Sequence, residues 1–298
     1  MRYSLIGSLL IGLLALPFQL ASAQEVKKFV IIAEEKRIDV GEGFRYDAWT
    51  YNGTVPGPVI RVHEGDDVEI TLVNKGKVAH GIDTHAAQIS PGRAFRAVDP
   101  GASHTFRFRA EAPGVFLYHC SAPPILNHIA NGLYGAMIVE PRKGFPPARE
   151  FVVVQGELYG EPDSQGLIAG DTKKMSEERP DFVIFDGAIN RHVGEPLPIK
   201  AGELVRVYFV NAGPNLVSSF HIIGTLLRTV YVGGNPENRL RGVQTFEVGP
   251  GNGAILEFMV KEPGDYPLVD HAIARVYKGA VALFRTEGYT PAPGGGSH

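Results

Sequence analysis

The chain has 298 residues, a formal net charge of −3 and no basic run, which argues against a nucleic-acid partner. It contains one cysteine, which excludes an internal disulfide. Its 36 glycines and 22 prolines are spread between short β-branched runs, and this pattern predicts an all-β chain with many turns.

The first 23 residues have the features of an export signal. Arg2 gives a positive start, residues 4–20 are almost wholly apolar, and Ala21-Ser22-Ala23 fits a cleavage site. We therefore predict cleavage near Gln24 and an exported, periplasmic protein. The apolar run is short for a membrane span, and no later stretch is long enough for one.

Strand-like runs then recur at short spacing and restart after the Pro/Gly-rich segment Pro141 to Pro147, which predicts a domain boundary. The predicted strands are 29–32, 44–51, 58–62, 68–73, 105–108, 115–119, 136–139, 151–154, 182–185, 205–210, 255–260 and 280–284. Short helical pieces are predicted over 125–133 and 272–277, and a loop with a helical turn over 171–180. The tail 290–298 is predicted to be flexible.

The two halves resemble each other. Leu72-Val73-Asn74-Lys75-Gly76 precedes His80, and Phe209-Val210-Asn211-Ala212-Gly213 precedes His221. Two copies of one β-sandwich, over residues 24–145 and 146–289, are the economical explanation. Only the first copy keeps a cysteine, while the second has Asp270-His271 in the corresponding region.

The lone cysteine, Cys120, lies just after a predicted strand, with His119 before it and His128 eight residues after it. Together with His80, it offers a thiolate and two imidazoles, which is the ligand set of a blue-copper site that a weak axial Met usually completes. A structural zinc site would need four strong ligands, and no fourth is found. The alternative is a buried, inert cysteine with unrelated histidines.

A second set of histidines points to a second metal. Adjacent side chains on a strand face opposite ways, so we expect His119 and Cys120 to serve two sites rather than one small site, and the odd separation of His80 and His85 has the same effect. His85 and His119, with His271, predict an all-imidazole site that keeps a position open for water or substrate. For His271 alone, the alternative is a satisfied core histidine.

These motifs resemble those of the copper-containing nitrite reductases, two-domain members of the multicopper oxidase group. The resemblance covers nearly all of the mature chain. The motifs that carry it are His80-Gly81-Ile82-Asp83-Thr84-His85, Tyr118-His119-Cys120 with His128, Ser218-Ser219-Phe220-His221-Ile222-Ile223-Gly224 and Val269-Asp270-His271. It implies two tandem cupredoxin-like Greek-key β-sandwich domains, a homotrimer, and dissimilatory one-electron reduction of nitrite to nitric oxide.

The resemblance also implies a role for each site residue. Type 1 copper would bind within the first domain, and type 2 copper between subunits, with His271 supplied by the neighbouring chain. Asp83 and His221 would handle protons over the type 2 copper, and Ile223 would shape the substrate pocket. A small cupredoxin or c-type cytochrome would donate the electron.

One position departs from the family pattern. The family's axial Met stands five residues after the second type 1 histidine, where this chain has Leu133. We predict that Leu133 is axial and that Met137 belongs to the core. Loss of a thioether donor should disfavour oxidised copper and raise the reduction potential of the type 1 site.

Two alternatives fit less well. A laccase-like oxidase needs several His-x-His pairs, which the chain lacks, and an electron carrier leaves His85, His119, Asp83, His221 and His271 unexplained. No metal is assigned to the remaining histidines, His63, His104, His192 and His298.

Overall fold

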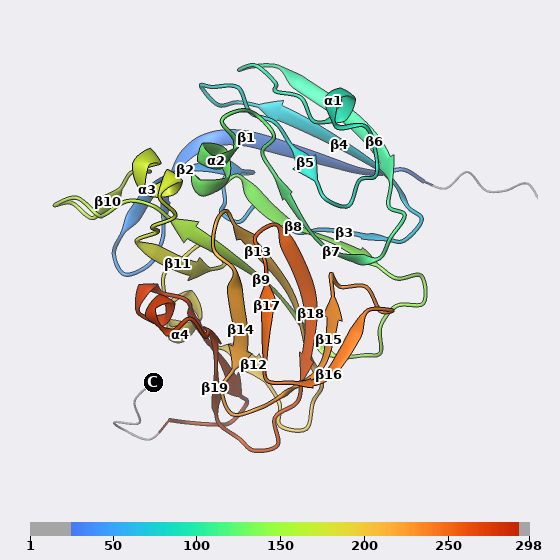
Figure 1. Ribbon diagram of the computed structural model, residues 1–298, viewed down its shortest axis with the longest axis vertical. Helices are drawn as coiled ribbons and strands as arrows, with labels where there is room; N and C mark the ends of the chain where they lie inside the picture. Colours follow the sequence, from blue (N-terminus) through green and yellow to red (C-terminus); the bar gives the residue numbers. More distant parts are fainter. Residues whose placement is uncertain (1–24, 292–298) are drawn as a thin grey trace, which may run out of the picture.

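The computed structural model describes residues 25–291. The predicted export signal and residues 292–298 of the predicted tail lie outside the described residues. Figure 1 shows two β-sandwiches: the first, coloured blue to green, lies above the second, coloured yellow to red. The predicted all-β, tandem-sandwich fold is confirmed.

The first sandwich packs a five-stranded sheet, in the order β10-β2-β1-β4-β6, against a four-stranded sheet, in the order β3-β8-β7-β5. Its elements are β1 (Lys27–Asp39), β2 (Arg45–Tyr51), β3 (Ile60–His63), β4 (Asp67–Asn74), β5 (Asp83–Thr84), α1 (Pro91–Ala94), β6 (Ser103–Arg109), β7 (Gly114–His119), α2 (Ile125–Ala130), β8 (Tyr134–Glu140) and β10 (Leu167–Ile168). β4 shows how the sequence sets the layers: its residues alternate between half-buried and buried, so one face lies on the core.

The second sandwich packs a six-stranded sheet, β11-β9-β13-β18-β15-β16, against a five-stranded sheet, β12-β20-β19-β14-β17. Its elements are β9 (Arg149–Leu158), α3 (Thr172–Ser176), β11 (Phe182–Phe185), α4 (Arg191–Gly194), β12 (Leu197–Ile199), β13 (Val205–Gly213), β14 (Ser218–Ile222), β15 (Leu227–Val232), β16 (Arg239–Val243), β17 (Thr245–Val248), β18 (Asn252–Phe258), β19 (Asp265–Asp270), the 3-10 helix η1 (Ile273–Lys278) and β20 (Val281–Thr286). β13 lies between β9 and β18 and is buried along its whole length, because its alternate side chains enter two different hydrophobic core clusters.

Every predicted strand overlaps an observed one, but the sequence pattern did not single out several strands of the second sandwich. β16 shows why. It carries Arg239 and Arg241 on an exposed edge of the six-stranded sheet, so it lacks the apolar alternation that marks a half-buried strand.

The predicted repeat has a counterpart in side-chain chemistry. Asn74 is the last residue of β4, and Asn211 lies two residues before the end of the equivalent strand β13. Both are fully buried. In each, the amide NH2 donates to two backbone carbonyls, at 2.7 and 2.8 Å. In each, the amide oxygen accepts from the N–H of the glycine two residues later, Gly76 or Gly213. The same residue therefore closes the same loop in both sandwiches.

A segment of the second half of the chain returns to the first sandwich. β10 pairs in parallel with β2, and Met175 of α3 packs against Ala130 at the end of α2. Residues that follow the predicted boundary at 145/146 thus help to hold α2, the helix that carries His128. The boundary itself stays a prediction.

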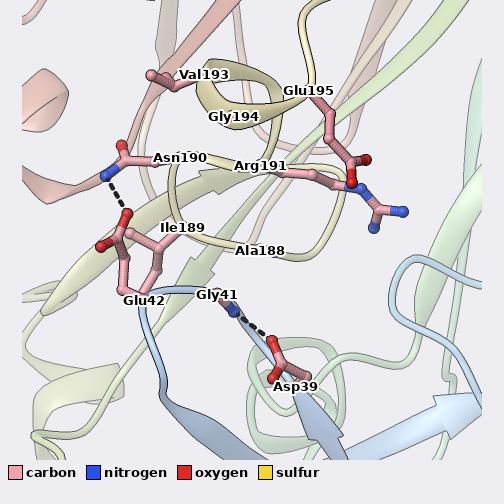
Figure 2. Close-up of a pocket in the computed structure, with 10 residues that line it drawn as sticks. All are labelled: Asp39, Gly41, Glu42, Ala188, Ile189, Asn190, Arg191, Val193, Gly194 and Glu195. Carbon is pink, nitrogen blue, oxygen red and sulfur yellow. Dashed lines mark hydrogen bonds between the residues drawn. The ribbon is translucent and has the colours of Figure 1, made fainter.

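The two sandwiches also meet at a surface hollow of about 680 Å³, drawn in Figure 2. One wall is the turn after β1, where Gly41 donates its N–H to Asp39, and the other is the loop that leads into α4. Glu42 and Asn190 hydrogen-bond across the hollow at 3.0 Å. None of the predicted metal ligands lines it.

Candidate metal centres

The three predicted type 1 ligands come together in the first sandwich. His80 precedes β5, Cys120 follows β7, and His128 lies on α2. Their donor atoms all lie within 4.8 Å of one another, and among residues 25–291 they form the only such group of three His, Cys, Asp or Glu residues.

The distances in this group suit one metal ion. The two Nδ1 atoms of His80 and His128 are 3.3 Å apart, and Cys120 Sγ is 3.1 Å from His128 Nδ1. Ligands bound at about 2.0 Å for nitrogen and about 2.3 Å for sulfur can be separated by at most the sum of the two bond lengths. The Gly81 N–H also donates to Cys120 Sγ at 3.2 Å, which suits a thiolate.

Burial sets the protonation of this group. Desolvation raises the pKa of the Cys120 thiol to about 11 and, with the nearby His80, lowers the pKa of His128 to about 4. Desolvation also lowers the pKa of His80. Both imidazoles are therefore neutral and ready to bind a metal, while the thiol keeps its proton until a metal displaces it. A buried soft sulfur with two neutral imidazoles fits copper.

Leu133 and Met137 are both fully buried, in the core cluster that also contains Cys120. Leu133 is tied to the type 1 residues through its backbone: its N–H donates to the His128 carbonyl, and its carbonyl accepts the Cys120 N–H, both at 3.1 Å. The sulfur of Met137 accepts a hydrogen bond from the Thr84 hydroxyl at 3.2 Å. The predicted axial role of Leu133 stays a prediction.

Two of the predicted type 2 ligands form a pair at the surface of the first sandwich. The Nε2 atoms of His85 and His119 are 3.1 Å apart. Their Nδ1 atoms lie 2.9 Å from the carbonyls of Gly251 and Cys120, respectively. An Nδ1–H that donates to a carbonyl leaves Nε2 as the lone-pair donor, so both rings are oriented for one metal. Burial lowers the pKa of His119, which keeps that ring neutral.

Asp83 lies next to this pair. It is half-buried on β5 and stands directly opposite His119 in the antiparallel pairing of β5 with β7. Directly opposite residues in such a pair have Cβ atoms about 5 Å apart. A carboxyl group is thus available beside the two imidazoles.

The other predicted residues form a second pair on the second sandwich. The rings of His221 and His271 are edge to face, with centroids 5.1 Å apart. The Nδ1 of His221 lies 2.7 Å from the Gln244 carbonyl, which leaves Nε2 free. His271 is exposed, and Ile223 lines a hollow of about 590 Å³ beside β19 and η1. Within the described residues, His271 does not complete a three-residue group with His85 and His119.

Two residues near the type 1 group were missed in the sequence. Trp49, the single tryptophan, packs edge-on against His128 and His80, with ring centroids at 4.6 and 5.4 Å. Glu35 lies with a carboxylate oxygen 3.4 Å from His80 Nε2. No local motif marks Glu35, because it lies on β1 and its partner lies in the segment between β4 and β5.

Comparison with known proteins identifies the family. Residues 33–144 match the family described as "Multicopper oxidase". A copper-containing nitrite reductase from Neisseria meningitidis serogroup A is 45% identical over 263 residues, which cover 85% of this chain and 68% of that protein. The corresponding protein of Cereibacter sphaeroides is 31% identical, over 90% of this chain and 78% of that protein.

Solved structures agree. The copper nitrite reductase from Nitrosomonas europaea superposes with a TM-score of 0.83 at 37% identity, over 89% of this chain and 95% of that chain. The fold, the grouped copper ligands and these similarities lead to one conclusion. The chain belongs to the copper-containing nitrite reductases, which are copper-dependent oxidoreductases.

Proposed function

We propose that this protein reduces nitrite to nitric oxide with two coppers per chain. The type 1 ion is held by His80, Cys120 and His128, and the type 2 ion by His85 and His119 with His271 of a neighbouring copy. The observation that carries the proposal is the separation of the imidazoles into two surface pairs on different sandwiches. Each pair is incomplete alone and is complete when two copies meet.

The reaction consumes one electron and two protons and releases water with nitric oxide. Bound copper supplies the one-electron transfer and a Lewis acid for the substrate oxygen. The chain supplies the connection, because His119 and Cys120 are bonded neighbours that end in different sites. Asp83 stands opposite His119 and delivers one proton, and His221 relays the second.

A homotrimer is part of this proposal, and exposed apolar surface supports it. Near His271, Tyr277 is 88% exposed and Ile273 is 48% exposed, and both line the same hollow as Ile223. We propose that these side chains belong to the interface between copies. A head-to-tail contact that joins the first sandwich of one copy to the second sandwich of the next forms a ring when its rotation closes, and a rotation of one third of a turn gives the proposed trimer.

The electron donor is proposed to be a small cupredoxin or a c-type cytochrome. Val78 and Ile125 are 42% and 46% exposed and stand close in sequence to His80 and His128. We propose them as an apolar contact for a transient redox partner.

We also propose that the protein works in the periplasm. Among residues 25–291, no helix has the length and apolar character needed to cross a membrane.

The test is anaerobic. Purified, copper-loaded protein, reduced and then mixed with nitrite, should form nitric oxide, and metal analysis should find two coppers per chain. Rapid oxygen uptake with phenols and no nitric oxide would instead indicate a laccase-like oxidase. One copper per chain and no nitric oxide would indicate an electron carrier.

A further inference from the structure

Glu35 lies behind the type 1 group, on the far side of the His80 ring. The Nδ1 of His80 faces His128, at 3.3 Å. The other nitrogen, Nε2, is fully buried, and within residues 25–291 no hydrogen bond of standard geometry reaches it. A carboxylate oxygen of Glu35 lies 3.4 Å from it. A shift of about 0.3 Å would bring this pair into the normal range for a hydrogen bond.

The backbone around this contact is built to hold it. The Lys77 N–H donates to both Glu35 carboxylate oxygens, at 2.9 and 3.0 Å, so the carboxylate is fixed in place. Gly76 lies against both partners: a Cβ there would stand 2.7 Å from His80 Nε2 and 3.0 Å from the Glu35 oxygen. Any other residue at position 76 would push the two groups apart.

Asn74 in turn holds the loop that contains Gly76 and Lys77. Its amide oxygen accepts the Gly76 N–H at 2.8 Å, and its NH2 group donates to two loop carbonyls. The equivalent loop of the second sandwich has the same asparagine, Asn211, with the same three bonds. The loop frame is thus common to both sandwiches, while the carboxylate–imidazole contact is added to it in the first.

We propose that Glu35 is a positioning residue for the type 1 copper. Its carboxylate accepts the Nε2–H of His80, which selects the tautomer whose Nδ1 lone pair faces Cys120 and His128. A carboxylate that supports a ligand histidine in this way orients the ring and makes it a stronger donor. Its negative charge also favours the more highly charged, oxidised ion. The inference rests on the proposed type 1 site.

This role would oppose the effect of Leu133. An axial leucine disfavours oxidised copper, and the Glu35 carboxylate stabilises it. The reduction potential of the type 1 copper would then depend on Glu35 of β1 as well as on Leu133.

Redox titration of the visible type 1 absorption tests the proposal on full-length, copper-loaded protein. Glu35→Gln should increase the ratio of reduced to oxidised copper at a fixed potential about tenfold, which is 59 mV for one electron. Glu35→Ala should shift the ratio further and lower copper retention, because it leaves Nε2 without an acceptor.

The matched control is Glu34→Gln. It makes the same charge change on the same strand, but adjacent strand side chains face opposite ways. The proposal is overturned by a Glu35→Gln protein with an unaltered potential, by an equal shift in Glu34→Gln, or by a loss of thermal stability alone. If Glu35→Ala fails to fold, Glu35→Gln decides. An unmodified protein without type 1 absorption would overturn the proposed copper site, and this inference with it.

Discussion

Corresponding regions of the two sandwiches place Cys120 in the first and Asp270 in the second, and both residues are fully buried. Each side chain accepts a backbone N–H at 3.2 Å from the neighbouring strand segment, Gly81 for the thiol and Ser219 for the carboxylate. The backbone hydrogen bond is the same in both sandwiches, but the other groups around the side chain differ. Cys120 faces two imidazoles, while Asp270 faces protein donors that satisfy it.

In the second sandwich, the hydrogen-bond donors around Asp270 come from the chain itself. Asp270 accepts hydrogen bonds from Gln155 at 3.2 Å, from the Ala272 N–H at 3.1 Å and from Arg275 at 2.8 Å. These bonds fix the residues on either side of His271. Corresponding positions of one fold thus place a thiol among imidazoles in the first sandwich and hold the residues around a histidine in the second, so function depends on the site and not on the fold.

The largest effect is expected at Cys120. Cys120→Ala removes the thiolate, so type 1 absorption should be lost and nitric oxide formation with a protein donor should fall to background. Because only one heavy atom is lost from the core, the metal-free protein should lose only about 1 kcal/mol of unfolding free energy. Turnover at the unmodified rate would show that electrons do not pass through this group.

His271→Ala should affect the two copper sites differently. We expect the type 2 copper to be lost, the type 1 colour to remain, and nitric oxide formation to fall by more than about 10³-fold, beyond the effect of removing a supporting group. Copper analysis and visible spectra check this. Loss of both coppers, or of neither, would contradict a site shared between copies.

Asp83→Asn should keep both coppers but lower kcat about 10²-fold, because it removes the carboxyl group that we propose as a proton donor. Steady-state rates across pH check this. Asp67→Asn, on the exposed β4 end of the same sandwich, is the control and should be neutral. An unchanged kcat would assign the first proton to another group.

Asp270→Ala should cost stability in the second sandwich. Removing this carboxylate takes an acceptor away from Gln155, from Arg275 and from two backbone N–H groups. We expect this to cost about 3 kcal/mol of unfolding free energy. Denaturant titration measures it. Asp265→Ala, on the same strand as Asp270, breaks a partly exposed pair with Arg285 of β20 and should cost less than about 1 kcal/mol. Equal losses of unfolding free energy in the two variants would contradict the structural role of Asp270.

The smallest effect is expected at the axial position. Leu133→Met should offer copper a thioether and lower the type 1 potential, so that the reduced fraction at a fixed potential falls about tenfold. Met137→Leu keeps the core volume, removes the acceptor of the Thr84 hydroxyl, and should leave the potential unchanged. A potential that responds to position 137 and not to 133 would reverse the assignment.

Sequence alone determined the β-sandwich class, the repeat and the ligand types. The class is confirmed, because strand alternation and turn residues are local signals. Alternation also separated Cys120 from His119: the first is fully buried beside His128, and the second reaches the half-exposed surface beside His85. The roles of these residues remain predictions.

Only the tertiary structure decided which distant groups meet. The return of β10 to the first sandwich, the pairing of His221 with His271, and the contact of Glu35 with His80 all join segments that are distant in the sequence. Such contacts depend on strand order and register, and a shift of one residue turns every side chain to the other face. The local sequence pattern therefore predicts which side chains could bind a metal, and the register of the sheets determines which of them lie together.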